Sequence, residues 1–273
     1  MQLETGWVDV ATGEQAFAAY RIRPTAANGP LPAVVVIQEA WGVDEHVQDL
    51  ARRLASAGYL TLAPDLYSVG GRPIELAAER VAAVKQFLET VSPAVWTDPA
   101  ERDRALATLP KGERDQVAGT MAVLFGGLDP GRHLAALDDA FRALQSDPAC
   151  DGNIGSVGWC MGGGLAARLA CREPRLGAAV VFYGSPPPDE EIPAIACPVL
   201  GFYGADDTRI TAAVPSFAEA MRRAGVAFEH RIYPGAPHAF FNDTRRSYRA
   251  DAARDAWARC LTFFAAHLAP MNA

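Results

Sequence analysis

The sequence lacks the features that mark nucleic-acid-binding, membrane and secreted proteins. Its net charge is −7, and it has no run of Lys and Arg, so we do not expect a nucleic-acid partner. No stretch approaches the roughly 20 apolar residues that a membrane helix needs. The first ten residues carry Glu4 and Asp9 where a signal peptide would have an apolar region. We therefore expect a cytoplasmic protein without a membrane partner.

Cysteine is also scarce. The five cysteines are an odd number and include no C-x-x-C pair. This usage favours a reduced protein without a disulfide framework or a zinc site. The sequence implies neither a metal nor a cofactor.

Strand and helix patterns alternate along the 273 residues, of which half are apolar. Such alternation predicts an α/β fold with a mostly parallel sheet and helices on both faces. Residues 31–37 are continuously apolar, which is typical of a buried central strand. Further strands are expected at 59–63, 154–157, 178–183, 198–203 and 227–233. Helices are expected at 44–57, 130–145, 164–171, 212–224 and 247–268.

One segment does not fit this alternation. Residues 68–128 contain two helical stretches, at about 74–91 and 113–125, and are longer than a simple crossover needs. We predict one α/β-hydrolase domain over 1–273, with 68–128 inserted as a helical cap that acts as a lid. A surface insertion that touches nothing catalytic is the alternative.

Residues 158–163 read Gly-Trp-Cys-Met-Gly-Gly, between a short apolar strand and a helix. A small residue two positions before and after a nucleophile, at a strand-to-helix turn, is the pattern of a nucleophile elbow. Gly158 and Gly162 fill these positions. The pattern predicts Cys160 as the nucleophile, and the start of a helix favours its thiolate form.

A base and an acid follow in the order that α/β-hydrolases use, which is nucleophile, acid and histidine. Strand 198–203 is followed by Asp206 and Asp207, and strand 227–233 is followed by a Gly/Pro loop that carries His238. Both loops lie past the carboxyl ends of strands, where open α/β sheets place their sites. We predict His238 as the general base and one of the two aspartates as its partner. The other four histidines fall within helix or strand patterns and are predicted to be structural.

Five short motifs between residue 33 and about 242 carry a family resemblance. They are Val-Ile-Gln-Glu at 36–39 with Trp41 and Gly42, Ala-Pro-Asp-Leu-Tyr at 63–67, the elbow at 158–163, Tyr-Gly-Ala-Asp-Asp at 203–207 and Gly-Ala-Pro-His-Ala-Phe at 235–240. The chain resembles the dienelactone hydrolase family, the carboxymethylenebutenolidase-like branch of the α/β-hydrolases. The resemblance implies a cysteine hydrolase of carboxylic esters or lactones with a Cys-His-Asp triad. Because the family places the acid three residues after a Gly, it favours Asp207 over Asp206.

The resemblance also implies a role for Glu39, which in this family contacts the nucleophile and helps to control its ionisation. The alternative is a loop carboxylate bound to backbone amides. The oxyanion hole is expected to consist of the backbone N–H groups of Ala40 and Met161.

The chain departs from the family where the family binds a substrate carboxylate with arginine. The residue four positions after His238 is Asn242, with Arg245 and Arg246 further on, and Arg72 is the candidate for a second such arginine. We therefore expect neutral ester or lactone substrates. The aromatic residues that could line their pocket, or simply pack in the core, are Trp41, Trp96, Trp159 and Phe240.

Two other functions are compatible with the pattern. The first is a non-catalytic protein that binds a small molecule in the hydrolase pocket. The second is a hydrolase of another electrophile, such as a phosphoester, with incidental esterase activity. The expected partner is a small molecule in each case, and the chain is expected to be a monomer or a homodimer.

Overall fold

The computed structural model describes residues 2–13, 15–92, 95, 98–126 and 129–268. The chain folds into two compact units. One comprises residues 1–69 and 131–273, and the other comprises residues 70–130. No helix in the described ranges is long and apolar enough to cross a membrane.

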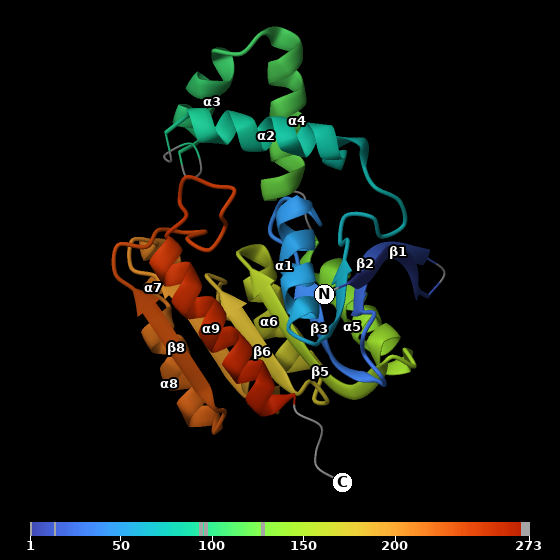
Figure 1. Cartoon of the computed structure of the whole chain (residues 1–273). Helices are drawn as coiled ribbons and strands as arrows, with labels where there is room; N and C mark the ends of the chain where they lie inside the picture. Colours follow the sequence, from blue (N-terminus) through green and yellow to red (C-terminus); the bar gives the residue numbers. More distant parts are fainter. Residues whose placement is uncertain (1, 14, 93–94, 96–97, 127–128, 269–273) are drawn as a thin grey trace. The chain divides into compact units, whose positions relative to one another are not determined.

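The larger unit is built on a sheet of eight strands in the order β1-β2-β4-β3-β5-β6-β7-β8 (Figure 1). Strand β1 pairs antiparallel with β2, and β2 pairs antiparallel with β4; every pair from β4 to β8 is parallel. The strands are β1 (Leu3–Thr12), β2 (Gln15–Pro24), β3 (Leu31–Ile37), β4 (Leu60–Pro64), β5 (Cys150–Trp159), β6 (Ala178–Phe182), β7 (Val199–Gly204) and β8 (Phe228–Tyr233). The mostly parallel sheet predicted from the sequence is confirmed.

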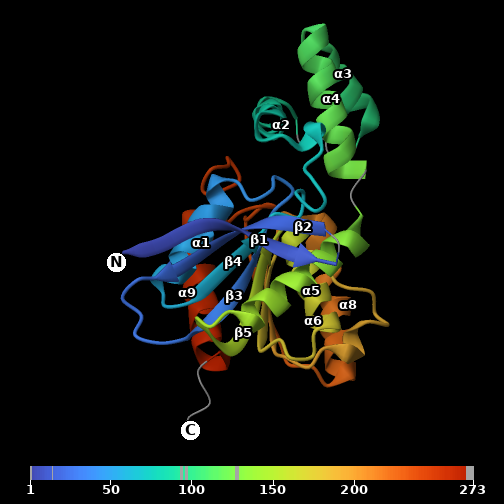
Figure 2. The ribbon, with the colours of Figure 1, turned by 90° about the vertical axis from the view of Figure 1, so that its right-hand side faces the viewer.

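Helices cover both faces of this sheet, as the view along its edge shows (Figure 2). The helices on one face are α1 (Glu45–Ser56) and α9 (Ala250–His267). Those on the other face are α5 (Pro130–Ser146), α6 (Met161–Arg172) and α8 (Val214–Ala224). The short helix α7 (Thr208–Thr211) precedes α8.

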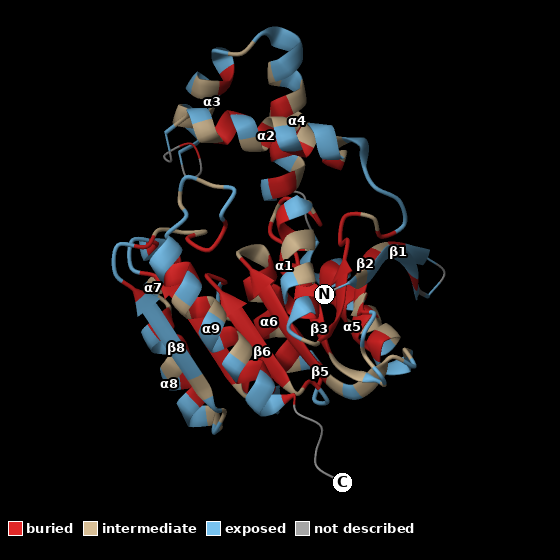
Figure 3. Ribbon diagram, in the orientation of Figure 1, coloured by how far each residue is buried: buried red, intermediate tan, exposed pale blue. Residues whose placement is uncertain are grey.

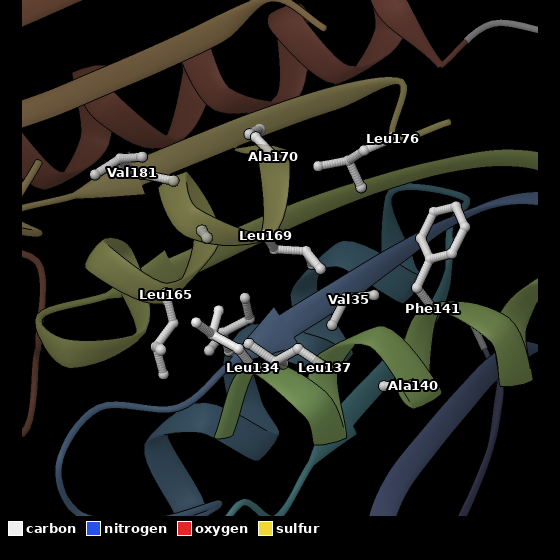
Figure 4. Close-up of a cluster of buried hydrophobic side chains, with 14 of the residues drawn as sticks. Val35, Leu134, Leu137, Ala140, Phe141, Leu165, Leu169, Ala170, Leu176 and Val181 are labelled. Carbon is white, nitrogen blue, oxygen red and sulfur yellow. The ribbon is translucent and has the colours of Figure 1, made fainter. Parts of the chain in front are cut away.

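Strand β3 shows why the sheet needs helices on both faces. Val34 and Val36 belong to the apolar cluster under α1 and α9, whereas Val35 and Ile37 belong to the cluster under α5 and α6. Side chains of a strand point alternately to opposite faces, so a continuously apolar strand requires two apolar layers. Figure 3 shows the central strands as almost wholly buried, and Figure 4 shows Val35 among the leucines of α5 and α6.

The hairpin of β1 and β2 is absent from the sequence-based assignment, which begins its strands at residue 31. Its turn includes Gly13, with a φ of 58°. From Tyr20 to Pro24, strand β2 alternates buried and partly accessible positions, with Tyr20 and Ile22 buried and Arg21 and Arg23 partly accessible. That alternation is the signal that would have predicted it.

The smaller unit is helical. It consists of a 3-10 turn (Ile74–Leu76), α2 (Ala78–Thr90), α3 (Pro99–Ala107) and α4 (Lys111–Gly126). The predicted helix at 74–91 is interrupted at Ala77, whose ψ of 144° is extended rather than helical. Helix α3 was not predicted, although Asp98 caps it by accepting from the N–H groups of Ala100 and Glu101. The role of this unit as a lid stays a prediction.

Candidate active site

Cys160 lies in the sharp turn between β5 and α6. Its φ is 56° and its ψ is −116°, a region that residues with a side chain rarely occupy. A Cβ atom at Gly158 would lie 1.9 Å from the carbonyl oxygen of Gly162, and one at Gly162 would lie 2.4 Å from the carbonyl oxygen of Gln38. Neither position therefore has room for a side chain, which is the physical reason for the glycine spacing seen in the sequence.

The thiol of Cys160 faces His238, which follows β8. The Sγ atom lies 3.1 Å from Nε2 of His238, and Nδ1 of His238 lies 2.5 Å from Oδ2 of Asp207. Asp207 is buried directly before α7, whereas Asp206 is exposed. The structure thus brings Cys160, His238 and Asp207 into one line of contacts and leaves Asp206 outside it.

The electrostatics of this line favour a charged imidazole. Burial lowers the pKa of His238, but the neighbouring Cys160 and Asp207 raise it by more, to about 10. A histidine normally titrates near 6.5. At neutral pH the geometry therefore favours an imidazolium between two groups that carry negative charge when ionised.

Glu39 lies just after β3 and is only 2% exposed. Its Oε1 accepts a hydrogen bond from the hydroxyl of Tyr183 at 3.1 Å, and its Oε2 accepts one from Nδ2 of Asn242 at 2.8 Å. The donors are side chains, so the alternative of a carboxylate held by backbone amides does not describe this residue. Both donors are neutral.

Tyr183 connects Glu39 to the other side chains of the site. It is fully buried, with a φ of 39°, and its ring packs edge-on against the imidazole of His238 with the ring centres 5.1 Å apart. Burial, followed by the proximity of Glu39 and of Cys160, raises the pKa of Tyr183 well above its usual value. Sequence reasoning noted this residue only as the end of a strand.

The two amides expected to form the oxyanion hole belong to adjoining segments, Ala40 to the loop after β3 and Met161 to the first turn of α6. A Cβ atom at Gly162 would lie 2.4 Å from the carbonyl oxygen of Ile37, so the first turn of α6 lies directly against the end of β3. Within the described part of the chain, no protein acceptor pairs with the N–H of Ala40 or of Met161. Both N–H groups therefore remain available to a ligand.

The residues named as candidates for substrate binding lie in different settings. Trp159 and Phe240 are fully buried; Trp159 stacks on Phe182 with ring centres 5.2 Å apart, and Phe240 packs edge-on against Tyr183. Complete burial favours the packing role that the sequence left open. Trp41 is buried too, and the guanidinium of Arg245 lies 5.2 Å from the centre of its ring.

The other two candidates belong to the segment between β4 and α5. Arg72 lies in the helical unit, where its Nη1 donates to the carbonyl of Leu76 at 2.7 Å. Trp96 lies outside the described residues. Among the residues that the structure describes, no three His, Cys, Asp or Glu side chains form a group that could hold a metal ion.

The strand order, the turn at Cys160 and the loops after β7 and β8 define an α/β-hydrolase fold. Residues 17–268 match the dienelactone hydrolase family. The chain belongs to this family, as its motifs predicted. Membership also confirms the predicted class of enzyme, a hydrolase that acts on ester bonds.

Individual relatives agree with this assignment. A protein of Saccharolobus solfataricus named "Putative carboxymethylenebutenolidase" is 36% identical over 238 residues, which cover 86% of this chain and 90% of that protein. A protein of the same name from Escherichia coli K12 is 30% identical over 270 residues, covering 95% and 86% respectively. A crystal structure titled "Putative Dienelactone Hydrolase" from Klebsiella pneumoniae has a TM-score of 0.75 and 30% identity, and the match covers 97% of this chain and 99% of that one.

Proposed function

We propose that this hydrolase uses Cys160 as its nucleophile, His238 as its general base and acid, and Asp207 as the partner of His238, on neutral carboxylic esters or lactones. The observation that carries the proposal is the continuous line of contacts from Sγ of Cys160 to Nε2 of His238 at 3.1 Å and from Nδ1 to Asp207 at 2.5 Å. A nucleophile within hydrogen-bonding reach of a base, which is oriented by a third group, is the arrangement that nucleophilic catalysis needs.

In the first half of the reaction, the thiolate of Cys160 attacks the carbonyl carbon and forms the S–C bond. The carbonyl oxygen becomes an oxyanion, which the N–H groups of Ala40 and Met161 bind. When this tetrahedral intermediate collapses, the C–O bond to the alcohol or enol breaks, and Nε2 of His238 supplies the proton that the leaving oxygen takes. In a lactone the released oxygen stays attached to the acyl group.

In the second half, water replaces the leaving group. Neutral His238 takes a proton from the water, whose oxygen attacks the thioester carbon through a second oxyanion at the same two amides. The C–S bond breaks, the carboxylic acid leaves, and Cys160 returns to its thiolate form beside the imidazolium. Asp207 stabilises the imidazolium throughout and holds Nδ1 in its protonated form.

Glu39 is assigned to the control of Cys160 ionisation. A carboxylate near a thiol disfavours the thiolate through like-charge repulsion unless the carboxylate itself accepts the proton. Tyr183 and Asn242 hold Glu39 in one orientation, and Tyr183 lies close to both Glu39 and Cys160. Tyr183 therefore links the carboxyl group of Glu39 to the surroundings of Cys160.

The preference for neutral substrates rests on Asn242. Its side chain is fully buried and is already engaged, with Nδ2 donating to Glu39 and Oδ1 accepting from the N–H of Thr244 at 3.0 Å. An amide in this state offers no positive charge to a substrate carboxylate. The buried carboxylate of Glu39 also disfavours an anionic group nearby.

The test is steady-state hydrolysis by the wild type and by Cys160→Ala of p-nitrophenyl acetate, p-nitrophenyl butyrate, a neutral butyrolactone and a carboxylated dienelactone. We expect turnover of the neutral substrates and a loss on the order of 10⁴-fold or more in kcat in the variant, as for other nucleophiles that act within a triad. Full turnover by Cys160→Ala would refute the nucleophile. Preference for the carboxylated dienelactone would refute the substrate class, and release of only one equivalent of product would favour a binding protein.

A further inference from the structure

Two hydrogen bonds connect the segment that carries Glu39 and Ala40 to a neighbouring turn. This turn, residues 65–68, follows β4 and contains the Asp-Leu-Tyr part of a family motif to which the reaction assigns no role. The N–H of Leu66 donates to Oε1 of Gln38 at 3.1 Å. The hydroxyl of Tyr67 donates to the carbonyl oxygen of Ala40 at 2.9 Å. The two bonds lie on either side of Glu39.

The turn is itself a rigid support, because it is bound to β2. The N–H of Asp65 donates to the carbonyl of Ala18 at 2.8 Å, and the N–H of Ala18 donates to Oγ of Ser68 at 2.9 Å. Oγ of Ser68 donates back to the carbonyl of Asp65 at 2.8 Å. Tyr67 is 3% exposed, so its hydroxyl is held on a fixed frame.

The hydroxyl of Tyr67 reaches one of the two peptide planes that meet at Ala40. The peptide group between Glu39 and Ala40 contains the Ala40 N–H and the Glu39 carbonyl. This carbonyl accepts a hydrogen bond from the N–H of Gly42 at 3.4 Å. The following plane ends in the Ala40 carbonyl, which accepts from Tyr67. With a partner on each plane, both backbone torsions of Ala40 are restrained, and the direction of its N–H is set.

We propose that Tyr67 is a positioning residue of this hydrolase, which aims the Ala40 N–H at the oxyanion through the Ala40 carbonyl. The proposal rests on the function proposed above. A phenylalanine would fill almost the same volume, whereas a buried hydroxyl needs a partner and here has the Ala40 carbonyl. Donors of an oxyanion hole are effective because they are held in place before the charge develops.

This role predicts a selective defect. Acylation by an ester passes through an oxyanion and depends on the aim of Ala40. Alkylation by iodoacetamide does not: the sulfur of Cys160 displaces iodide from carbon, and no oxyanion forms. A residue that only supports the fold would affect both reactions, whereas a residue that aims the amide affects the first alone.

The experiment measures both rates in the wild type, in Tyr67→Phe and in Tyr20→Phe. Tyr20 in β2 is a matched control. It is 7% exposed, and its hydroxyl accepts a hydrogen bond from Nη1 of Arg52 at 3.2 Å. For Tyr67→Phe we expect acylation by p-nitrophenyl acetate to slow by about 10- to 100-fold with little change in KM, since small misplacements have effects of this size. Alkylation is expected to stay within about twofold of the wild type, and Tyr20→Phe is expected to leave both rates unchanged.

The proposal is overturned if Tyr67→Phe acylates as fast as Tyr20→Phe, or if its acylation and alkylation rates fall together. Should Tyr67→Phe fail to fold, Gln38→Met tests the other hydrogen bond to this turn, which joins the N–H of Leu66 to Oε1 of Gln38. It is expected to slow acylation selectively and to a smaller extent, and parallel losses in this variant would equally overturn the proposal. Failure of the proposed function is recognised separately, by turnover in Cys160→Ala.

Discussion

Two buried carboxylates belong to the candidate active site, and their surroundings differ. Asp207 is 8% exposed and contacts His238, which can carry a positive charge. Glu39 is 2% exposed. In the described chain, the side chains that donate hydrogen bonds to its carboxylate are Tyr183 and Asn242, and both are neutral. The same type of group is thus paired with a side chain that can carry positive charge at Asp207 and with neutral hydrogen-bond donors at Glu39. The different roles proposed for the two carboxylates therefore follow from their environments and not from residue type.

The largest effect is expected where the carboxylate faces a charge. Asp207→Asn removes the negative charge and lets Nδ1 of His238 adopt the wrong tautomer, so kcat for p-nitrophenyl acetate should fall by about 10⁴-fold. Asp206→Asn is the matched control, since Asp206 is exposed and the aspartate that contacts His238 is Asp207. Its kcat should stay within about twofold of the wild type. A reversed result would exchange the two assignments.

Substitution of the other carboxylate sharpens the comparison. Glu39→Gln replaces the carboxylate by a neutral amide of nearly the same shape. Ester turnover should fall by about 100-fold, at the lower end of the range typical of a group that assists proton transfer. Alkylation of Cys160 by iodoacetamide at neutral pH should not slow, because removal of a negative charge favours the thiolate. Parallel losses of turnover and alkylation would show that Glu39 only supports the structure.

The hydrogen bonds that neutral side chains donate to Glu39 are expected to matter for stability. Asn242→Leu keeps the approximate volume but leaves Oε2 of Glu39 without the bond that Nδ2 provides. The free energy of unfolding should fall by about 1–3 kcal/mol, the usual effect of an unsatisfied buried acceptor. Urea denaturation at pH 7 measures it. An unchanged midpoint would mean that Glu39 finds another donor.

The smallest effect concerns pH. The pKa of His238 is raised in the folded chain to about 10, so the stability it contributes is complete below its unfolded value near 6.5 and is lost as the pH rises through 10. The difference in unfolding free energy between the wild type and His238→Gln should therefore shrink between pH 7 and pH 10. A third of the side chain is exposed, so we expect a change of about 1 kcal/mol or less. A difference that grows with pH would contradict the direction of the shift.

Much of the fold could be predicted because the deciding interactions are local. The apolar run of β3, the helical spacing of α1 and the glycines around Cys160 each express a requirement that acts within a few residues. The β1–β2 hairpin was missed because β1 is exposed along almost all of its described length and β2 alternates only over its second half, which leaves a short signal. The interruption at Ala77 was missed because the apolar spacing continues through it.

The line of contacts through Cys160, His238 and Asp207 could also be predicted, since each of these residues follows a strand in a parallel sheet. The carboxyl ends of parallel strands lie at the same end of the sheet, so residues that directly follow these strands are expected near one another. The partners of Glu39 could not be predicted in this way. Tyr183 lies 144 positions further along the chain and Asn242 lies 203 positions further.

The sequence by itself therefore determined the glycine-flanked turn at Cys160, the order in which Cys160, Asp207 and His238 follow their strands, and the membership of the family, because each depends on a pattern of neighbouring residues. Only the tertiary structure decided that Glu39 is held by Tyr183 and Asn242, and that Tyr67 holds the Ala40 carbonyl. The physical reason is that a buried hydrogen bond needs its two groups within about 3 Å, and side chains from different strands and loops reach that distance only once the sheet has assembled.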